Sequence, residues 1–253
     1  MMEIKRNKIY YMDCLEGMKY MKDNSVDLVL TDPPYNISRK RTFTRDNAKD
    51  VTLDFGDWDY QDEEDFYKWF KIVCKEWKRV LKREGQILTF GPRDWKYAKV
   101  LDDVFKIKRE LAWKKSNPAP HYMKNSYITS YERIFWCINK GVEKKEITFN
   151  FLEQKEMHDF IETSVCMGKE RTSHKTQKSI EVLQKLLRIH SDEGDLVLDS
   201  FMGSGSTAEA CMSLKRDFIG FENDKESLDI MINERFGLRA KDIIERVEGG
   251  QIK

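Results

Sequence analysis

The amino-acid sequence predicts an α/β fold with a doubly wound, mostly parallel sheet. Short apolar runs typical of buried strands alternate with amphipathic segments typical of helices. Three of the strand runs end directly in an acid, at Asp13, Asp199 and Glu222. Strands that alternate with helices favour parallel pairing, because each helix returns the chain to the edge where the next strand begins.

Composition limits the class of protein. The length of 253 residues fits one large α/β domain or a domain with an insertion. No apolar run approaches transmembrane length and no signal peptide precedes the first strand, so we expect a cytoplasmic protein without a membrane partner. The five dispersed cysteines favour reduced thiols over disulfides or zinc. With a formal net charge of +1, nucleic-acid binding would depend on local basic patches.

The spacing of apolar residues predicts the elements in order. Large apolar side chains recur every three or four residues from Phe66 to Leu81, which predicts an amphipathic helix with its aromatic stripe in the core. Asp62 is a suitable N-cap for this helix, and Gly85 is expected to follow its end. The other strands are expected at 9–13, 27–31, 86–90, 107–113, 133–138, 195–199 and 218–222, and the other helices at 15–21, 95–104, 179–190, 208–214 and 225–236.

The strand at 27–31 runs directly into Asp32-Pro33-Pro34-Tyr35. The two prolines fix φ and lack a backbone donor, so the strand stops and the loop is stiff. Such a loop holds a carboxylate, a free carbonyl and an aromatic ring in fixed relative positions. That arrangement suits a planar, amino-bearing group gripped at its edge and its face, although a turn with a packed tyrosine is an equal alternative from this motif alone.

A polar and basic segment follows this loop. Its cations include Arg39, Lys40, Arg41 and Arg45, and its position predicts a phosphate-binding or closing loop, with a solvated surface loop as the alternative. Residues 50–65 are acidic and are expected to face away from nucleic acid. Residues 141–171 show no clear period, so we expect an insertion near 139–172 that varies with the substrate.

A glycine-rich turn follows the strand that ends at Asp199. Gly203 and Gly205 allow the backbone to approach a ligand closely. The third glycine of the dinucleotide fingerprint is missing, and no Gly-Lys-Ser/Thr phosphate loop is present. Glu222 ends the next strand, where an acid can bind ribose hydroxyls. This unit therefore predicts a nucleoside cofactor without a bound phosphate, and NAD is the alternative.

Together, these two motifs resemble those of the DNA amino-methyltransferases that use S-adenosylmethionine. The order of catalytic motif first and cofactor motif last is similar to their β group, as is His174-Lys175-Thr176-Gln177-Lys178, although Lys175 and Ser179 replace two prolines. The resemblance spans Asp13 to Glu222 and implies a Rossmann-like methyltransferase fold with a circularly permuted motif order. The C-terminal strands should then lie beside strand 27–31.

The resemblance also implies domains and partners. Residues 1–253 would form one catalytic domain, with an inserted target-recognition region at 139–172 and a flexible DNA-facing loop at 36–60. Double-stranded DNA is the implied substrate. Homodimerisation and a cognate restriction endonuclease acting on the same site are further expectations, in a nucleoid-associated protein of prokaryotic or phage type.

The resemblance also implies roles for the residues of this sequence that match the family's motifs. The catalytic loop is Asp32, Pro33, Pro34 and Tyr35, in which Asp32 and the Pro33 carbonyl accept amino N–H groups and Tyr35 stacks on a flipped base. The residues implied to bind the cofactor are Asp13, Cys14, Asp32, Thr176, Gln177, Asp199, Phe201, Gly203, Ser204, Gly205, Thr207 and Glu222. The candidates for DNA contact are Arg39, Lys40, Arg41, Arg45, Lys114, Lys115, Lys169 and Arg171. No grouping of histidine with cysteines or acids suggests a metal.

The expected activity is site-specific transfer of a methyl group to the exocyclic N6 of adenine, because the Asp form of the motif is commoner among adenine enzymes of that family. Cytosine N4 is the close alternative. An RNA or protein amide methyltransferase, and a DNA-binding protein that has lost catalysis, are further alternatives. The recognition sequence cannot be read from one chain, since it depends on which loops enter which groove.

Overall fold

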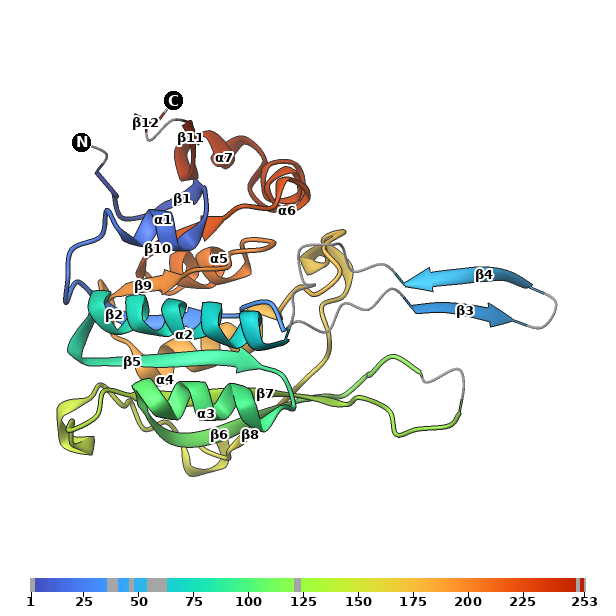
Figure 1. The fold of residues 1–253 in the computed structure, drawn as a ribbon, viewed down its shortest axis with the longest axis horizontal. Helices are drawn as coiled ribbons and strands as arrows, with labels where there is room; N and C mark the ends of the chain where they lie inside the picture. The colour runs from blue at the N-terminus through green and yellow to red at the C-terminus, as the bar shows by residue number, and fades with distance from the viewer. Residues whose placement is uncertain are drawn as a thin grey trace.

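Most strands of the chain form one central sheet (Figure 1). The computed structural model describes residues 3–35, 41–45, 48–53, 63–120, 124–248 and 251–252. Within these residues the sheet has ten strands in the order β12-β11-β1-β10-β9-β2-β5-β7-β6-β8. Their bounds are β1 Lys8–Tyr11, β2 Val26–Thr31, β5 Leu81–Gly91, β6 Lys106–Lys115, β7 Tyr131–Ile138, β8 Phe160–Thr163, β9 Leu196–Asp199, β10 Asp217–Glu222, β11 Ile244–Glu248 and β12 Gln251–Ile252.

The sheet is mostly parallel, as predicted. Strands β11, β1, β10, β9, β2 and β5 pair in parallel, whereas β7 is antiparallel to both β5 and β6. At the centre, β2 pairs with β9 in the register Leu28↔Val197 and Val29↔Leu198. The late strands thus lie beside the strand that ends at Thr31, which confirms the permuted order expected from the motifs.

Helices cover both faces of the sheet, so the doubly wound prediction is confirmed. Helices α1 Cys14–Met18, α2 Glu63–Val80 and α3 Trp95–Val104 pack in one apolar cluster, and α4 Ile180–His190, α5 Ser206–Ser213, α6 Lys225–Ile230 and α7 Ala240–Ile243 pack in the other. Figure 1 shows α2 and α3 in front of the sheet, with α4 and α5 behind it. The inner strands are buried on both faces, which explains their nearly continuous apolar sequences.

The long helix α2 forms where the apolar periodicity predicted it. Three acids lie in its first turn, and Lys78 and Arg79 lie in its last turn. Both placements interact favourably with the helix dipole. Phe70 and Trp77 are fully buried, so the aromatic stripe is core. The predicted N-cap Asp62 lies outside the described residues. Gly85 comes after the end of the helix at Val80, as predicted, but it lies inside β5, where a Cβ would come 2.7 Å from the Leu81 side chain.

Three other segments contain elements that the sequence pattern does not predict. The expected loop at 36–60 contains an antiparallel pair, β3 Arg41–Arg45 and β4 Ala48–Leu53, which projects from the sheet (Figure 1). The expected helix 225–236 changes at Met231 into a π-helical turn that ends at Phe236. The segment 141–171 contributes β8, which pairs in parallel with β6. Short runs of four to six residues carry too little periodicity to be read from sequence.

The five cysteines are all free and buried, consistent with the predicted reduced thiols. Among the residues described above, none of the helices combines the length and the apolar character that a membrane crossing would need.

Candidate active site at the carboxyl edge of the sheet

The carboxyl ends of the parallel strands bring the two main motifs together. Strand β2 ends at Thr31, immediately before Asp32, and β9 ends at Asp199, immediately before the glycine-rich turn. The Thr31 hydroxyl donates a 2.6 Å hydrogen bond to Asp199 Oδ1. Because β2 and β9 are neighbours, this buried bond joins the loop at Asp32 directly to the glycine-rich turn.

Asp199 fixes the start of the glycine-rich turn. Its Oδ1 also accepts the backbone N–H of Phe201 at 3.1 Å, and the Thr207 hydroxyl is a further hydrogen-bond partner of the carboxylate. Burial raises the pKa of Asp199 to about 6, against the lowering effect of these hydrogen bonds. The geometry gives Asp199 and Thr207, both expected to bind a cofactor, a positioning role within the protein.

The glycine-rich turn is tied to Glu222 at the end of β10. Gly203 and Gly205 adopt φ values of +53° and +77°, which favour glycine. The backbone N–H of Gly203 donates to Glu222 Oε2 at 2.6 Å, and those of Asn223 and Asp224 donate to Oε1. A carboxylate has about four acceptor sites, so about one of them is left for a ligand hydroxyl.

The surroundings of this turn suit a nucleoside. The Phe201 ring packs edge-on against Trp69 of α2, with centroids 5.8 Å apart. His174 lies against Gly203, where a Cβ would come 3.4 Å from His174 Nε2. Burial lowers the pKa of His174 to about 4, and its buried Nδ1 has no hydrogen-bond partner among the described residues. A neutral imidazole ring that lies against the glycine-rich turn and has an unpaired nitrogen is compatible with a polar ligand at this turn.

The remaining residues expected to bind a cofactor fall into two groups. Asp13 caps α1, since its Oδ1 accepts the N–H groups of Leu15 and Glu16, and Cys14 is buried beneath it. The side-chain amide of Gln177 forms hydrogen bonds within its own segment: Oε1 accepts from Thr172, and Nε2 donates to the Glu170 carbonyl. The side chains of Asp13 and Gln177 therefore form hydrogen bonds within the protein. Ser204 is buried within the glycine-rich turn, and Thr176 is exposed.

The loop at Asp32 has partners that its motif does not reveal. Asp32 Oδ1 accepts a hydrogen bond from the Tyr35 hydroxyl, and Oδ2 pairs with the ammonium of Lys178. Lys178 Nζ also lies 3.3 Å from Glu132 Oε2, and Glu132 Oε1 pairs with Lys115 Nζ at 2.6 Å. Two carboxylates and two ammonium groups thus alternate along one cluster.

The charges of this cluster are strongly coupled. Burial raises the pKa of Asp32, against the lowering effect of Lys178. Burial alone would lower the pKa of Lys178, but attraction to Asp32 and Glu132 outweighs it and raises that pKa. Burial likewise opposes ionisation of Glu132, but Lys178 and Lys115 lower its pKa below the ordinary value. Of the two acids, Asp32 is therefore the one more readily protonated.

Sequence reasoning missed this cluster in part. The sequence motifs assign no role to Lys178, although it stands in the third motif, and they predict that Lys115 contacts DNA. The sequence patterns assign no role to Glu132, although an acid near the start of a strand whose last five residues are apolar is a usable signal for a buried ion pair. Spacing in the sequence gives no hint of the contact, because Asp32 and Lys178 are 146 positions apart.

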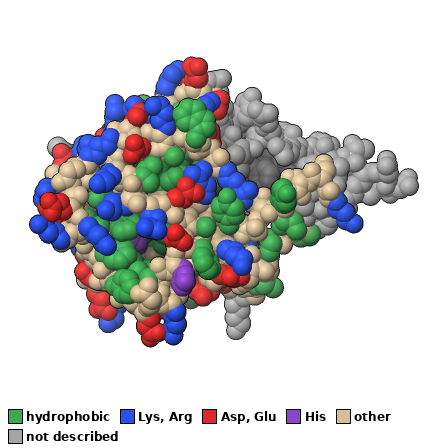
Figure 2. All heavy atoms as spheres, turned by 90° about the horizontal axis from the view of Figure 1, so that it is seen from below, with side chains coloured by type: hydrophobic (Ala, Val, Ile, Leu, Met, Phe, Trp, Pro, Cys, Tyr) green, Lys and Arg blue, Asp and Glu red, His purple; other side chains and the backbone are tan. Residues whose placement is uncertain are grey.

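The structure describes only some of the basic residues that were candidates for DNA contact. Arg39 and Lys40 lie outside the described residues, and only the backbone of Arg41, Arg45 and Lys169 is described. Lys114 pairs with Glu162 at 3.0 Å on the exposed surface, and Arg171 is exposed. Figure 2 shows Lys and Arg interspersed with Asp and Glu on the face in view, so a basic patch is not evident on that face.

Side chains capable of holding a metal do not cluster in the described part of the chain, where His, Cys, Asp and Glu form no group of three or more at ligand spacing. The carboxylates of Asp32, Asp199 and Glu222 are instead paired with an ammonium group, hydroxyls or backbone N–H groups of the protein.

Comparison with known proteins identifies this arrangement. A family model described as DNA methylase, covering N6 and N4 enzymes, matches residues 26–233. The chain belongs to this DNA methylase family. The matched range contains the loop at Asp32, the glycine-rich turn and Glu222.

Individual relatives agree with the family. The chain is 29% identical over 241 residues to the type II methyltransferase M.HinfI of Haemophilus influenzae, covering 88% of this chain and 67% of the relative. It is 30% identical over 238 residues to the type II methyltransferase M2.DpnII of Streptococcus pneumoniae, covering 88% and 87%. Among solved structures, the complex of M1.HpyAVI with SAM matches with a TM-score of 0.69 and 27% identity, over 90% of this chain and 98% of that one. Membership of the DNA methylase family therefore rests on both sequence and fold.

Proposed function

We propose that this chain is a site-specific DNA methyltransferase that transfers a methyl group from S-adenosylmethionine to the exocyclic N6 of adenine. The observation that carries the proposal is the Thr31–Asp199 hydrogen bond, because it fixes the loop at Asp32 beside the glycine-rich turn. Methyl transfer needs the acceptor amino group and the donor held in line, and this bond unites the two loops that would hold them.

The described residues fit S-adenosylmethionine. When bound, this cofactor supplies an electrophilic methyl group on a sulfonium with a neutral leaving group. The free acceptor site of Glu222 would take a ribose hydroxyl, and Phe201 with Trp69 would contact the adenine. The Gly203 and Gly205 backbone allows close approach, and the His174 ring places its Nε2 against Gly203.

Asp32 would prepare the acceptor amino group. The lone pair of an exocyclic amino nitrogen is delocalised into its ring, so the nitrogen is a poor nucleophile. Asp32 and the Pro33 carbonyl would each accept an N–H and draw the nitrogen toward tetrahedral geometry. The amino proton becomes acidic only as the methyl bonds, so Asp32 can receive it without being a strong base. An incoming N–H competes with the Tyr35 hydroxyl for Asp32 Oδ1, which frees the Tyr35 ring to stack on a flipped base.

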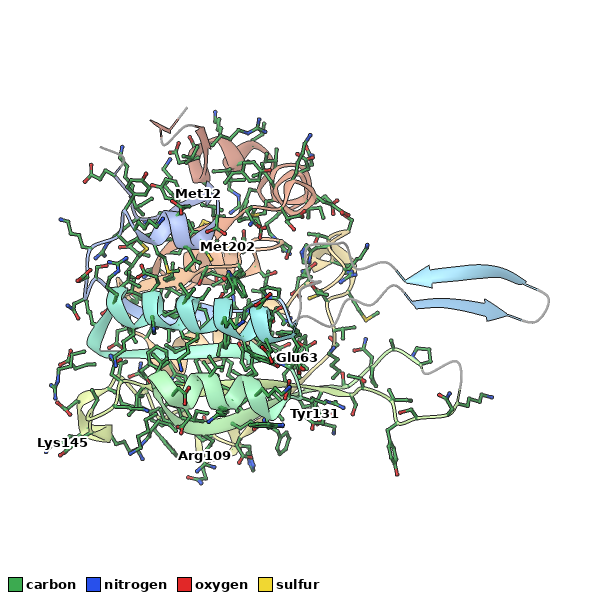
Figure 3. All side chains as sticks on the ribbon, viewed as in Figure 1. Met12, Glu63, Arg109, Tyr131, Lys145 and Met202 are labelled. Carbon is green, nitrogen blue, oxygen red and sulfur yellow. The ribbon has the colours of Figure 1, made fainter. Side chains whose placement is uncertain are left out.

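DNA would approach the carboxyl edge of the sheet. Figure 3 places Tyr131 and Glu63 at the edge toward which β5 runs, whereas Lys145 lies at the opposite edge. The early part of the expected recognition region 139–172 thus lies away from the loop at Asp32. We assign recognition to the part after β8, together with the loop 36–60 and basic residues such as Arg171. Homodimerisation and a cognate endonuclease remain expectations of the proposed function.

Labelled S-adenosylmethionine incubated with duplex DNA, RNA or protein tests the proposed function. We expect label in duplex DNA only, and N6-methyladenine after digestion to nucleosides. Label in N4-methylcytosine would move the proposal to the alternative base, and label in RNA or protein alone would overturn it. Whole-genome DNA as substrate, followed by mapping of the methylated positions, would give the recognition sequence.

Cofactor binding should depend on pH through Glu222. Burial raises the pKa of Glu222 to about 7 from an ordinary 4.5, despite three backbone N–H groups that lower it. The ionised carboxylate accepts a ribose hydroxyl more strongly, so the Kd for S-adenosylmethionine should be about tenfold higher at pH 6 than at pH 8. The folded chain also holds a proton that the unfolded chain has released between pH 4.5 and 7, so this group's contribution to stability falls as pH rises through that window.

Titration calorimetry of the wild-type protein and of Glu222→Gln measures this dependence. The variant should bind more weakly at pH 8 and lose the pH dependence, because its side chain cannot ionise. A wild-type Kd that stays constant from pH 6 to pH 8 would contradict the role given to Glu222.

A further inference from the structure

The ion cluster beneath the catalytic loop draws on segments far apart in the sequence. Asp32 follows β2, Lys178 precedes α4, Glu132 lies near the start of β7 and Lys115 ends β6. The Lys178 side chain is 9% exposed, and the side chains of its two acid partners are each 22% exposed. A lysine buried this deeply costs free energy unless it is paired, so its placement here calls for a reason.

The ammonium of Lys178 is held on several sides. It pairs with Asp32 Oδ2 and Glu132 Oε2, and it lies 5.1 Å from the Phe90 ring centroid and 5.9 Å from that of Tyr35. Glu132 is fixed in turn by Lys115, at 2.6 Å. The carboxylate plane of Asp32 is thereby set by groups outside its own loop, while the Tyr35 hydroxyl is its contact within the loop.

We propose that Lys178 is a positioning residue for methyl transfer, whose ammonium keeps Asp32 ionised and oriented to accept the target amino group, while the Glu132–Lys115 pair holds that ammonium in place. The inference rests on the proposed function. Protonated Asp32 would present an O–H donor where the amino N–H needs an acceptor, so its charge state determines whether it can act. With Lys178 present, the cluster has two ammonium groups and two carboxylates, so its charges balance.

The charge balance can be altered in both directions. Among the described residues, Lys178→Met leaves Asp32 and Glu132 facing each other with Lys115 as their one counter-charge, so Asp32 should hold its proton to a higher pH. Glu132→Gln removes the neighbouring negative charge, so Asp32 should ionise more readily. The double variant restores the balance with one cation and one carboxylate.

Other ionisable groups also face Asp32, and the test must separate their titration from its own. These groups are Tyr35 in its own loop, Lys178, Glu132 on β7, Tyr97 on α3, and Asp199 after β9. Burial raises the pKa of both tyrosines well above 10, so neither titrates in the acid range. Asp199, with a pKa of about 6, is common to every variant, so differences between variants report on Asp32.

The experiment measures single-turnover methylation of DNA by the full chain from pH 5 to 9, so that chemistry and not product release is observed. Lys178→Met should move the midpoint of the acid limb upward by at least about one pH unit, with activity recovering at high pH. Lys178→Arg should retain more activity at pH 7 than Lys178→Met. Glu132→Gln should move the midpoint downward, and the double variant should return it toward the wild-type value.

Lys175→Met serves as the matched control, because it removes an exposed lysine from the same segment and should leave the midpoint in place. Rates of Lys178→Met lowered equally at every pH would assign Lys178 a purely structural role and overturn the inference. If Lys178→Met does not fold, Glu132→Gln provides the test: an acid-limb midpoint equal to that of the wild type would overturn the inference. A wild-type protein that does not methylate DNA would instead refute the proposed function.

Discussion

Asp32→Ala is expected to reduce the rate of methyl transfer by at least about 10²–10³-fold, the loss typical of removing one preorganised group that acts on the developing charge. Alanine cannot accept the amino N–H, so the nitrogen lone pair stays delocalised into the base. Of the two acid partners of Lys178 among the described residues, the substitution leaves Glu132. Cofactor affinity should change by less than about threefold, because the Glu222 side of the site is untouched.

Asp32→Asn is the matched control, since it keeps the shape and one acceptor oxygen but removes the charge that faces Lys178. It should retain more activity than Asp32→Ala and remain far below the wild type. Single-turnover kinetics with labelled S-adenosylmethionine, together with titration of cofactor binding, separates the two effects. Turnover by Asp32→Ala within tenfold of wild type would refute the role of Asp32.

Trp77→Ala is expected to lower the free energy of unfolding by about 3–5 kcal/mol, as large-to-small substitutions of buried aromatic residues do. Trp77 is fully buried on α2, and its ring packs edge-on against Phe70 with centroids 5.8 Å apart. Its indole N–H donates a 2.6 Å hydrogen bond to the Ser200 hydroxyl. The indole therefore supports both the core and the start of the glycine-rich turn.

Trp77→Phe separates these two contributions, because it keeps most of the buried ring and removes the indole N–H. We expect a loss of about 1–2 kcal/mol for this variant, from the hydrogen bond and a small cavity. Urea unfolding of both variants, of Ser200→Ala and of the double variant Trp77→Phe with Ser200→Ala gives the coupling free energy between Trp77 and Ser200. Loss of less than about 1 kcal/mol in Trp77→Ala would contradict the packing described for α2.

Local sequence patterns suffice to locate the long helices of this protein. Apolar periodicity located α2 and α3 with almost their observed bounds, because a helix of ten or more residues repeats its buried face several times. Strand pairs as short as β3 and β4 lack such a repeat. Gly85 follows the end of α2 as predicted, but the structure gives a different reason for a glycine there, which is its close contact with Leu81 in β5.

The sequence by itself determined the fold class, the Asp32-Pro33-Pro34-Tyr35 loop and the turn around Gly203, because each is a short contiguous pattern with a local physical meaning. Only the tertiary structure decided which charges meet. Strand order and register bring Lys178 and Glu132 to Asp32 and set Thr31 against Asp199, and they leave the carboxylate of Asp13 as a helix cap. These are contacts between side chains of distant segments, and their geometry is fixed by how the sheet is assembled.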